Sequence, residues 1–553
     1  MEKWKKNDML EIILVDELSP EQASFRPMSF VRPDSLFVFR MLKEPRYLHD
    51  IDWELYRRKN ITIWRDNNGT LISVGPSAHL LYEERNVCFE MIRSSDILQT
   101  TLKCAIYGKT DATIAETATF FWSLPDKRDR DPRLAVGTFQ SYNPEHVFDF
   151  SALQPEQLVS IMDANPKRVI EIHNGIWSTE QAETLVTRPY PIHLKFVTLH
   201  GSRKVALADG RRVCAFKDGG RAFVEALEQR QSSFGSLFIT YDRNACDKGE
   251  MPVAHEYLER ILKLDIFESF AVGPILDKEC ALLPFVMTTD ALHYEISAKT
   301  FESSHFASLR IVPRELSITL NLDGLHRDDW HRYVIAFLNR LSELGHLERL
   351  DLSLGRSSWD YYRDMLNRIV QALIGVIHTN PRLKRLSLFD NSCSSLEWTF
   401  FLQILYRAME THESLLSFRT KRCWSDDVDS SLVQLLSRNQ NISVYDQTGK
   451  RCFTQNIGKI YRDRFYHTST ELGKAPPSVR TSLVITALIE TALEHYQRAA
   501  TLLFNHTDIL CEMLQDNVDT FNSSQPIAGE SPSEAFLYRS HKRTRHCNVL
   551  YEF

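Results

Sequence analysis

Three stretches of this 553-residue chain share one pattern: LERLDLSLG at 347–355, LKRLSLFDN at 383–391 and LLSFRTKRC at 415–423. The second stretch has Leu, Leu, Leu and Asn in every position of the spacing Leu-x-x-Leu-x-Leu-x-x-Asn/Cys, and the other two match it with replacements. Between the stretches, apolar residues recur at three- and four-residue steps, the spacing of one helix face. Short strands alternating with amphipathic helices predict an α/β chain built on a parallel sheet.

The same alternation extends toward the N-terminus. LQPEQLVSIMDANP at 153–166 predicts a helix that ends at Asn-Pro, and KRVIEIHNG at 167–175 predicts a strand directly after it. ALIGVIHTNP at 372–381, followed by RLKRLSLFDN, has the same order. Further strands are expected in the segments 191–199, 234–244, 266–275, 291–301 and 315–324. The array is expected to begin near residue 151 and to end at NISVYDQTG, 441–449.

These features resemble leucine-rich-repeat proteins of the ribonuclease-inhibitor-like class. More narrowly, the chain resembles an expanded group of uncharacterised repeat proteins from diatoms. The resemblance is carried by NPRLKRLSLFDN from Asn380, FKDGGRAFVEALEQRQSSFGSL from Phe216 and SLVITALIETALEHYQRAATLLFNHTDILCEML from Ser482. It implies a solenoid, in which a curved parallel sheet carries helices on its outer side and binds proteins on its concave side. It implies no enzymatic activity.

Four regions are expected along the chain. Residues 1–150 are read as a small strand-rich module, with a hairpin turn at Asn68-Gly69 and a strand at ATIAETATFFWSL, 112–124. Residues 151–450 hold degenerate leucine-rich repeats, and residues 451–520 form a helical C-terminal cap whose main helix runs from Ser478 to Leu514. Residues 521–553, rich in Ser, Pro and Gly at their start, are read as a flexible tail.

Composition narrows the class of function. The hydrophobic fraction of 43% and charged fraction of 25% are those of a globular protein, and the net charge of -6 argues against a nucleic-acid partner. The ten cysteines stand singly with no metal-ligand spacing, so neither a metal nor a cofactor is expected. No signal peptide or membrane-spanning run is found, which predicts a soluble intracellular protein, cytoplasmic in the first place. Nuclear import through the basic tail from Arg539 to His546 is the alternative.

Four short motifs have a chemical interpretation and a simpler structural one. HRDDWHR from His326 offers acid–base pairs but also caps a helix. FKDGG from Phe216 resembles a phosphate loop but lacks the Gly-Lys-Ser/Thr that follows in such loops. CWSDDVDSS from Cys423 has three aspartates but no distant Glu for calcium, so a helix-capping loop is expected. LQPEQLVSIM from Leu153 resembles the start of an F-box, yet a predicted strand follows too soon for the remaining helices.

The function expected from these observations is a non-enzymatic scaffold that binds a protein partner through the concave face of the array. Strand residues alternate faces, so the polar residues between the core leucines are expected to line or rim that face. They are Glu348, Arg349, Asp351, Ser353, Lys384, Arg385, Ser387, Phe389, Arg419 and Lys421. The alternative is an adaptor or regulator of an enzyme, such as a ubiquitin-ligase substrate receptor or a GTPase regulator. A helical F-box-like module at residues 1–150 would favour that alternative, and a strand-rich module would not.

Overall fold

The computed structural model of this chain describes most of residues 9–447. The described segments are 9–29, 31–32, 36–50, 60–94, 99–125, 132–137, 146–197, 214–240, 253–275, 277–297, 303–322, 329–355, 363–389, 401–420 and 426–447, with residues 300, 325 and scattered positions from 449 to 511. The chain divides into two compact units, residues 1–458 and residues 459–553. All strands described below belong to the first unit.

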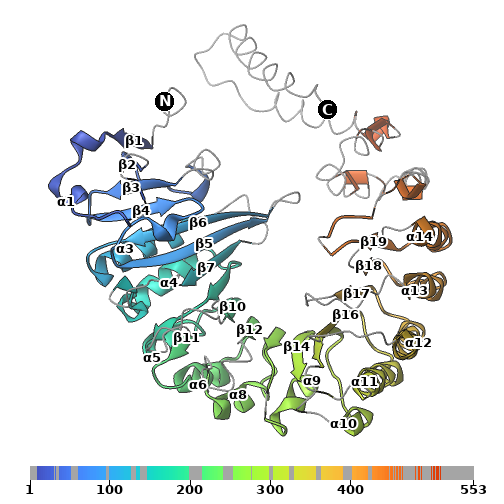
Figure 1. Ribbon diagram of the computed structural model, residues 1–553. Coiled ribbons are helices and arrows are strands. Elements are labelled where there is room, and N and C mark those ends of the chain that lie inside the picture. The colour runs from blue at the N-terminus through green and yellow to red at the C-terminus, as the bar shows by residue number, and fades with distance from the viewer. Residues whose placement is uncertain are drawn as a thin grey trace. The chain divides into compact units, whose positions relative to one another are not determined.

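The first unit is an α/β structure built on one large, mostly parallel sheet (Figure 1). Within the described residues the sheet has 17 strands and is open. Its parallel part follows chain order: β7 (Arg133–Gly137), β8 (Val169–Ile172), β10 (Ile192–Val197), β12 (Gly235–Thr240), β13 (Phe267–Val272), β14 (Ala291–Ser297), β15 (Glu315–Asn321), β16 (Arg349–Gly355), β17 (Arg385–Phe389), β18 (Ser417–Arg419) and β19 (Ser443–Tyr445). Two short strands, β9 (Gly175–Trp177) and β11 (Cys214–Phe216), pair separately in parallel.

The strand pairing aligns the apolar residues that define the sequence pattern. Leu350 pairs with Leu316 on one side and Leu386 on the other, and Leu386 pairs with Phe418. All four side chains are fully buried. Burial of each such side chain contributes about 2 kcal/mol of hydrophobic free energy. The three quoted stretches therefore form strands β16, β17 and β18, and the pairing register places their pattern-defining apolar residues in one core.

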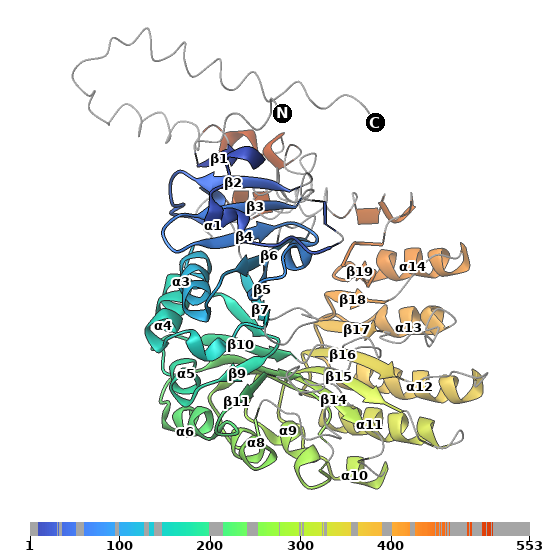
Figure 2. The same ribbon diagram turned by 60° about the vertical axis from the view of Figure 1, so that its left-hand side comes forward.

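Helices lie between the strands of the parallel part and along one face of the sheet (Figures 1 and 2). They are α4 (Pro155–Ala164), α5 (Thr179–Thr184), α6 (Arg221–Gln229), α8 (His255–Ile261), α9 (Leu283–Val286), α10 (Ser303–Ala307), α11 (Trp330–Leu344), α12 (Arg363–Thr379), α13 (Leu402–Met409) and α14 (Asp426–Arg438). In α11 the three- and four-residue spacing predicts one apolar face, and four of its residues, Trp330, Val334, Phe337 and Leu341, are buried, while the fifth, Leu344, is partly exposed. A short 3-10 turn and α9 replace a full helix between β13 and β14.

A ladder of buried polar side chains joins the turns that lead from helix to strand. The side-chain amide of Asn380 donates to the carbonyl oxygens of Val376 (2.9 Å) and Leu341 (3.3 Å), and its Oδ1 accepts from the Leu347 N–H (2.9 Å). One turn later, the ring of His412 contacts the Asn380 carbonyl oxygen at 3.0 Å. We call Asn380, His412 and Asn439 the turn ladder.

Asn439 continues the turn ladder by donating from Nδ2 to the carbonyl oxygens of Met409 and His412, each at 2.9 Å. Carbonyls at a helix end have no partner within the helix, and a buried one must find a partner elsewhere. The Asn-Pro ends expected for α4 and α12 are thus confirmed, with Asn165 and Asn380 directly after the two helices.

The N-terminal strands add to the same sheet through β7. They are β1 (Leu10–Ile13), β2 (Phe37–Met41), β3 (Ile61–Arg65), β4 (Thr70–Val74), β5 (Asn86–Ser94) and β6 (Gln99–Tyr107). Their pairing order is β1-β2-β3-β4-β6-β5-β7, antiparallel except between β2 and β3. The hairpin predicted at Asn68-Gly69 joins β3 to β4, and Gly69 has the positive φ of 66° that a tight turn needs.

The strand expected at 112–124 is wrong, because this segment forms helix α3 (Asp111–Trp122). The hydroxyl of Thr110 caps the helix by accepting from the Thr113 N–H. Ile114, Ala118 and Phe121 are buried at helical spacing, which the β-branched and aromatic composition concealed.

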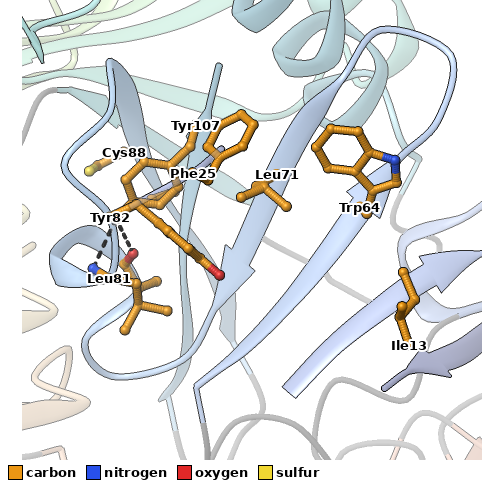
Figure 3. Close-up of a cluster of buried hydrophobic side chains, with 10 residues drawn as sticks. Ile13, Phe25, Trp64, Leu71, Leu81, Tyr82, Cys88 and Tyr107 are labelled. Atoms are coloured by element: carbon orange, nitrogen blue, oxygen red, sulfur yellow. Dashed lines mark hydrogen bonds between the residues drawn. The ribbon is translucent and has the colours of Figure 1, made fainter. Parts of the chain in front are cut away.

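Both faces of the N-terminal strands are covered. On one face α3 packs, with Trp122 edge-on to Phe89 at a ring-centroid distance of 5.9 Å. On the other, Phe25 and Tyr82 pack over strand residues that include Trp64 and Tyr107 (Figure 3).

Hydrogen bonds hold the two tyrosines of this second layer. The Tyr107 hydroxyl donates to the Ala78 carbonyl oxygen (2.6 Å) and accepts from the Leu81 N–H (3.2 Å). Burial raises the pKa of Tyr82 to about 12, against the opposing effect of its hydrogen bond with Thr62. The segments that contain Phe25 and Tyr82 therefore close the second face at this end of the sheet.

Beyond residue 458, most positions of the expected helix from Ser478 to Leu514 lie outside the described residues, and most of those described have helical backbone. The expected tail at 521–553 and the basic segment from Arg539 to His546 also lie outside them. The boundaries at 150, 450 and 520 stay predictions. Among the described residues, no helix combines the length and the apolar run that crossing a bilayer requires.

Candidate functional site

The candidate site is the side of strands β7 to β19 that faces away from helices α4 to α14, here called the strand face. Every second strand residue points toward it. The parallel register aligns these residues into rows, one per position along the strands. The central row is Ala135, Glu171, Lys195, Phe238, Ala271, His293, Ser317, Asp351, Ser387, Arg419 and Tyr445. Neighbours in a row lie about 5 Å apart, so their side chains interact across strands.

Glu171 is the centre of a charged cluster near the N-terminal end of the strand face. It is 5% exposed, and its Oε1 accepts from Lys195 Nζ at 3.1 Å and lies 3.2 Å from Arg133 Nη1. His173 Nε2 lies 3.8 Å from Oε2. Burial lowers the pKa of His173, and Lys195 lowers it further, although Glu171 and Glu90 act in the opposite direction. The buried carboxylate is therefore balanced by Lys195 and Arg133, with a largely neutral imidazole beside it at pH 7.

A second cluster lies across β14, β15 and β16. Asp351 is 3% exposed and accepts from Arg349 through Nη2 (2.6 Å) and Nε (2.8 Å). Arg349 Nη1 also lies 3.6 Å from Glu315 Oε2. Burial, and then the positive charge of Arg349, lower the pKa of the neighbouring His293. Arg349 is shared between two carboxylates, so the cluster links adjacent strands and keeps a net charge of about -1.

The aromatic part of the strand face lies next to that cluster. The rings of Phe238 and His293 are 5.6 Å apart, although β13 separates their strands. Ala271 occupies the central row between them, and its small side chain leaves the space in which the two rings meet.

The rim at the beginning of the strands carries a ladder of exposed ion pairs. Glu348 accepts from Lys384 Nζ at 2.6 Å, and Arg314 Nη1 lies 3.8 Å away. The hydrogen bond from Lys384 lowers the pKa of Glu348. Such solvent-exposed pairs contribute at most about 1 kcal/mol each.

The last strands carry positive charge that no described carboxylate neutralises. Arg385 on β17 is exposed and Arg419 on β18 is partly exposed, and within the described residues neither has an acidic group within 4.0 Å. We call Arg385 and Arg419 the basic patch. Two accessible guanidinium groups without a described carboxylate are suited to contact with an acidic surface.

The ten predicted contact residues differ widely in exposure. Arg385 is exposed, and Arg349 and Arg419 are partly exposed. Asp351, Ser353 and Ser387 face the predicted side but are only 3%, 4% and 7% exposed, so they offer little contact area. Glu348 and Lys384 lie on the rim. Phe389 has its backbone in β17, while its side chain and the whole of Lys421 lie outside the described residues. That these residues contact a partner stays a prediction.

No protein-family model matches this chain, and no curated protein does. The candidate site therefore rests on register, burial and charge.

The chemical motifs of the sequence occupy structural positions where the structure describes them. The FKDGG segment opens α6, and the Asp218 carboxylate caps this helix by accepting from the Gly220 N–H (3.0 Å) and the Ala222 N–H (2.8 Å). In HRDDWHR, Asp329 directly precedes α11 and His331 is buried, while residues 326–328 lie outside the described residues. The loop expected at CWSDDVDSS is in part wrong, because residues 426–431 already belong to α14.

The Glu171 cluster and His293 were not among the predicted site residues. Both lie in segments whose strands were predicted, at positions of the correct alternation. The central row runs from Asp351 back to His293 and Glu171. Predicting it from sequence requires the register of each strand pair, and the degenerate repeats do not show that register.

Proposed function

We propose that this chain is a non-enzymatic scaffold of the leucine-rich-repeat type, ribonuclease-inhibitor-like, that binds a protein partner through the strand face. In such a solenoid the strand face is the concave one. The observation that carries the proposal is the basic patch: Arg385 and Arg419 are accessible cations without a described carboxylate, on a face where other charges are paired. The partner is therefore expected to present acidic side chains.

The repeat assignment is supported by the order of elements and by the sheet register. Each unit from β15 onward has one strand followed by one helix, and the parallel pairing aligns Leu316, Leu350, Leu386 and Phe418. Full helices in place of short turns account for successive patterns that start 36 and 32 residues apart, at 347, 383 and 415.

The N-terminal strands are proposed to cap this end of the array. A stacked array needs terminal elements that cover its apolar end. Here α3 covers one face of the strands, and the layer that contains Phe25 and Tyr82 covers the other. The adaptor alternative gains no support here, because the described part of residues 9–137 is a sheet with a single long helix and α4 leads directly into β8.

We place the scaffold inside the cell, in the cytoplasm in the first place. None of the cysteines that the structure describes is joined to another in a disulfide, and this holds for Cys88 and Cys104 on adjacent strands. Disulfides are common in secreted proteins of oxidising compartments and rare in the cytosol.

The test is affinity purification from extracts of the source cells with three versions of the chain. Wild type is compared with Arg385→Glu/Arg419→Glu and with Arg368→Glu/Arg407→Glu, which makes the same change of charge at exposed positions of α12 and α13. Extracts are treated with nuclease, so that a bridging nucleic acid is excluded. The proposal expects a protein that wild type and the helix-side variant retain, and that the strand-face variant loses. Equal retention by all three versions would overturn it.

A further inference from the structure

A histidine, an aspartate and a cysteine meet beside helix α8, away from the basic patch. His255 is the first residue of α8, while Asp277 and Cys280 lie in the segment that follows β13. One ring nitrogen of His255, one carboxylate oxygen of Asp277 and the Sγ of Cys280 all lie within 4.8 Å of one another. In the described part of the chain, this is the one group of three or more potential metal ligands found so close together.

Backbone contacts fix two of these side chains in one turn. The Oδ1 atom of Asp277 accepts from the Cys280 N–H (2.9 Å) and the Glu279 N–H (3.0 Å), and the Asp277 carbonyl oxygen accepts from the Ala281 N–H (3.0 Å). Spacing of three residues in one turn brings the carboxylate and the thiol to the same side.

His255 is positioned by a contact between the start of α8 and the turn before α6. The Ala254 N–H donates to the Gly219 carbonyl oxygen at 2.9 Å, which fixes the start of α8. A hydrogen bond from the Cys280 thiol to Asp277 accounts for the closeness of those two groups, but not for the imidazole beside them.

We propose that His255, Asp277 and Cys280 bind one Zn²⁺ ion, with water in the fourth position. Zinc accepts nitrogen, oxygen and sulfur ligands together in tetrahedral geometry, and three protein ligands with an open fourth position are a known arrangement. His255 and Asp277 are exposed, so an ion has a path from solvent, while Cys280 is buried behind them.

Binding requires one proton to leave. The ion replaces the thiol proton of Cys280, the sulfur becomes a thiolate ligand, and the proton passes to solvent. Burial, together with the Asp277 carboxylate, raises the pKa of Cys280 to about 11, so the thiol is protonated at neutral pH. Zinc affinity at such a site rises with pH, because the metal and the proton compete for the same sulfur.

The first measurement uses the full-length, untagged protein and Co²⁺ as a spectroscopic substitute for Zn²⁺. Wild type is expected to show thiolate-to-cobalt charge-transfer absorption that disappears when Zn²⁺ is added. Absence of that band in the folded wild-type protein would overturn the proposal, whatever the variants do.

The second measurement compares Zn²⁺ titrations by calorimetry. Cys280→Ser and His255→Ala are expected to lower the affinity at least about tenfold, since even second-shell substitutions commonly cost that much. The matched controls Cys511→Ser and His378→Ala change the same residue types at exposed positions, and we expect them to bind one Zn²⁺ as wild type does. A site of unchanged affinity in Cys280→Ser, or one lost in Cys511→Ser, would contradict the assignment.

Discussion

His412 and Asn380 are joined across two successive repeat turns, with the His412 ring nitrogen Nε2 at 3.0 Å from the Asn380 carbonyl oxygen. Both residues are buried, and Asn439 continues the connection by donating to the His412 carbonyl oxygen. Carbonyl oxygens at these helix ends have no partner within the helix, and here they accept hydrogen bonds from side chains of the following repeat. The turn ladder explains how repeats of unequal length keep a common register.

Replacing Asn380 tests the turn ladder. Asn380→Ala removes the acceptor of the Leu347 N–H and both side-chain donations, so we expect a loss of about 2–3 kcal/mol of local stability. Hydrogen exchange measures this loss, and the Leu347 amide is expected to exchange faster in the variant. Asn367→Ala, at an exposed position of α12, should change it by less than about 0.5 kcal/mol. Equal effects of the two substitutions would contradict this role.

The pair Arg349 and Asp351 should be strongly coupled. Arg349→Met leaves the Asp351 carboxylate buried without its cation, and we expect a loss of about 3 kcal/mol in unfolding free energy. Arg349→Met/Asp351→Val removes both charges and should recover most of it. Denaturant unfolding of the two single variants and the double variant measures the coupling, and additive losses would show that the pair does not act as a unit.

Two half-buried histidines of the strand face, His173 and His293, give a pH dependence. The pKa values of His173 and His293 are lowered by burial in the folded chain, so below about pH 6.5 the unfolded chain binds more protons. The unfolding free energy is therefore expected to fall as the pH drops from about 6.5 toward the pKa values of the folded chain. Above about pH 6.5 these two histidines should not affect it. In thermal unfolding, His173→Gln/His293→Gln should lose less stability than wild type over this range. The exposed His378→Gln serves as the control, and parallel curves for both variants would refute this account.

Gly175 should tolerate no side chain. It has a φ of 107°, and an added Cβ would lie 2.2 Å from a ring carbon of Phe150. Gly175→Ala is expected to cost more than about 2 kcal/mol from strain and overpacking, read as a lowered midpoint of thermal unfolding. In Gly355→Ala the new Cβ meets only ordinary contacts, the nearest at 3.8 Å, so its midpoint should stay close to that of wild type.

Local patterns predicted the elements but not what covers them. The leucine pattern predicted β16 and β17, and Asn-Pro predicted the ends of α4 and α12, because both depend on the residues in place. In α3, β-branched and aromatic residues led to a strand prediction that the Thr110 cap and the buried helical face overrule. The cover of Phe25 and Tyr82 over the N-terminal strands depends on contacts between distant segments, which no local period contains.

Prediction of the candidate sites was also limited, because it depends on which distant segments lie next to one another. Asp351 and Arg385 were correctly assigned to one side of the sheet, but burial of Asp351 by its neighbours could not be predicted from alternation. The group of His255, Asp277 and Cys280 escaped a search for close cysteine pairs, because its ligands differ in type and are far apart in sequence. A spacing of Asp and Cys by three residues was the one local signal.

The most direct test of the strand-face proposal is arginine-specific labelling with phenylglyoxal, read by mass spectrometry, with and without the purified partner. We expect Arg385 and Arg419 to be protected in the complex, while Arg368 and Arg407 on the helices react as in the free protein. Protection confined to the helix-side arginines, or no protection at Arg385 and Arg419, would show that the partner does not bind the strand face.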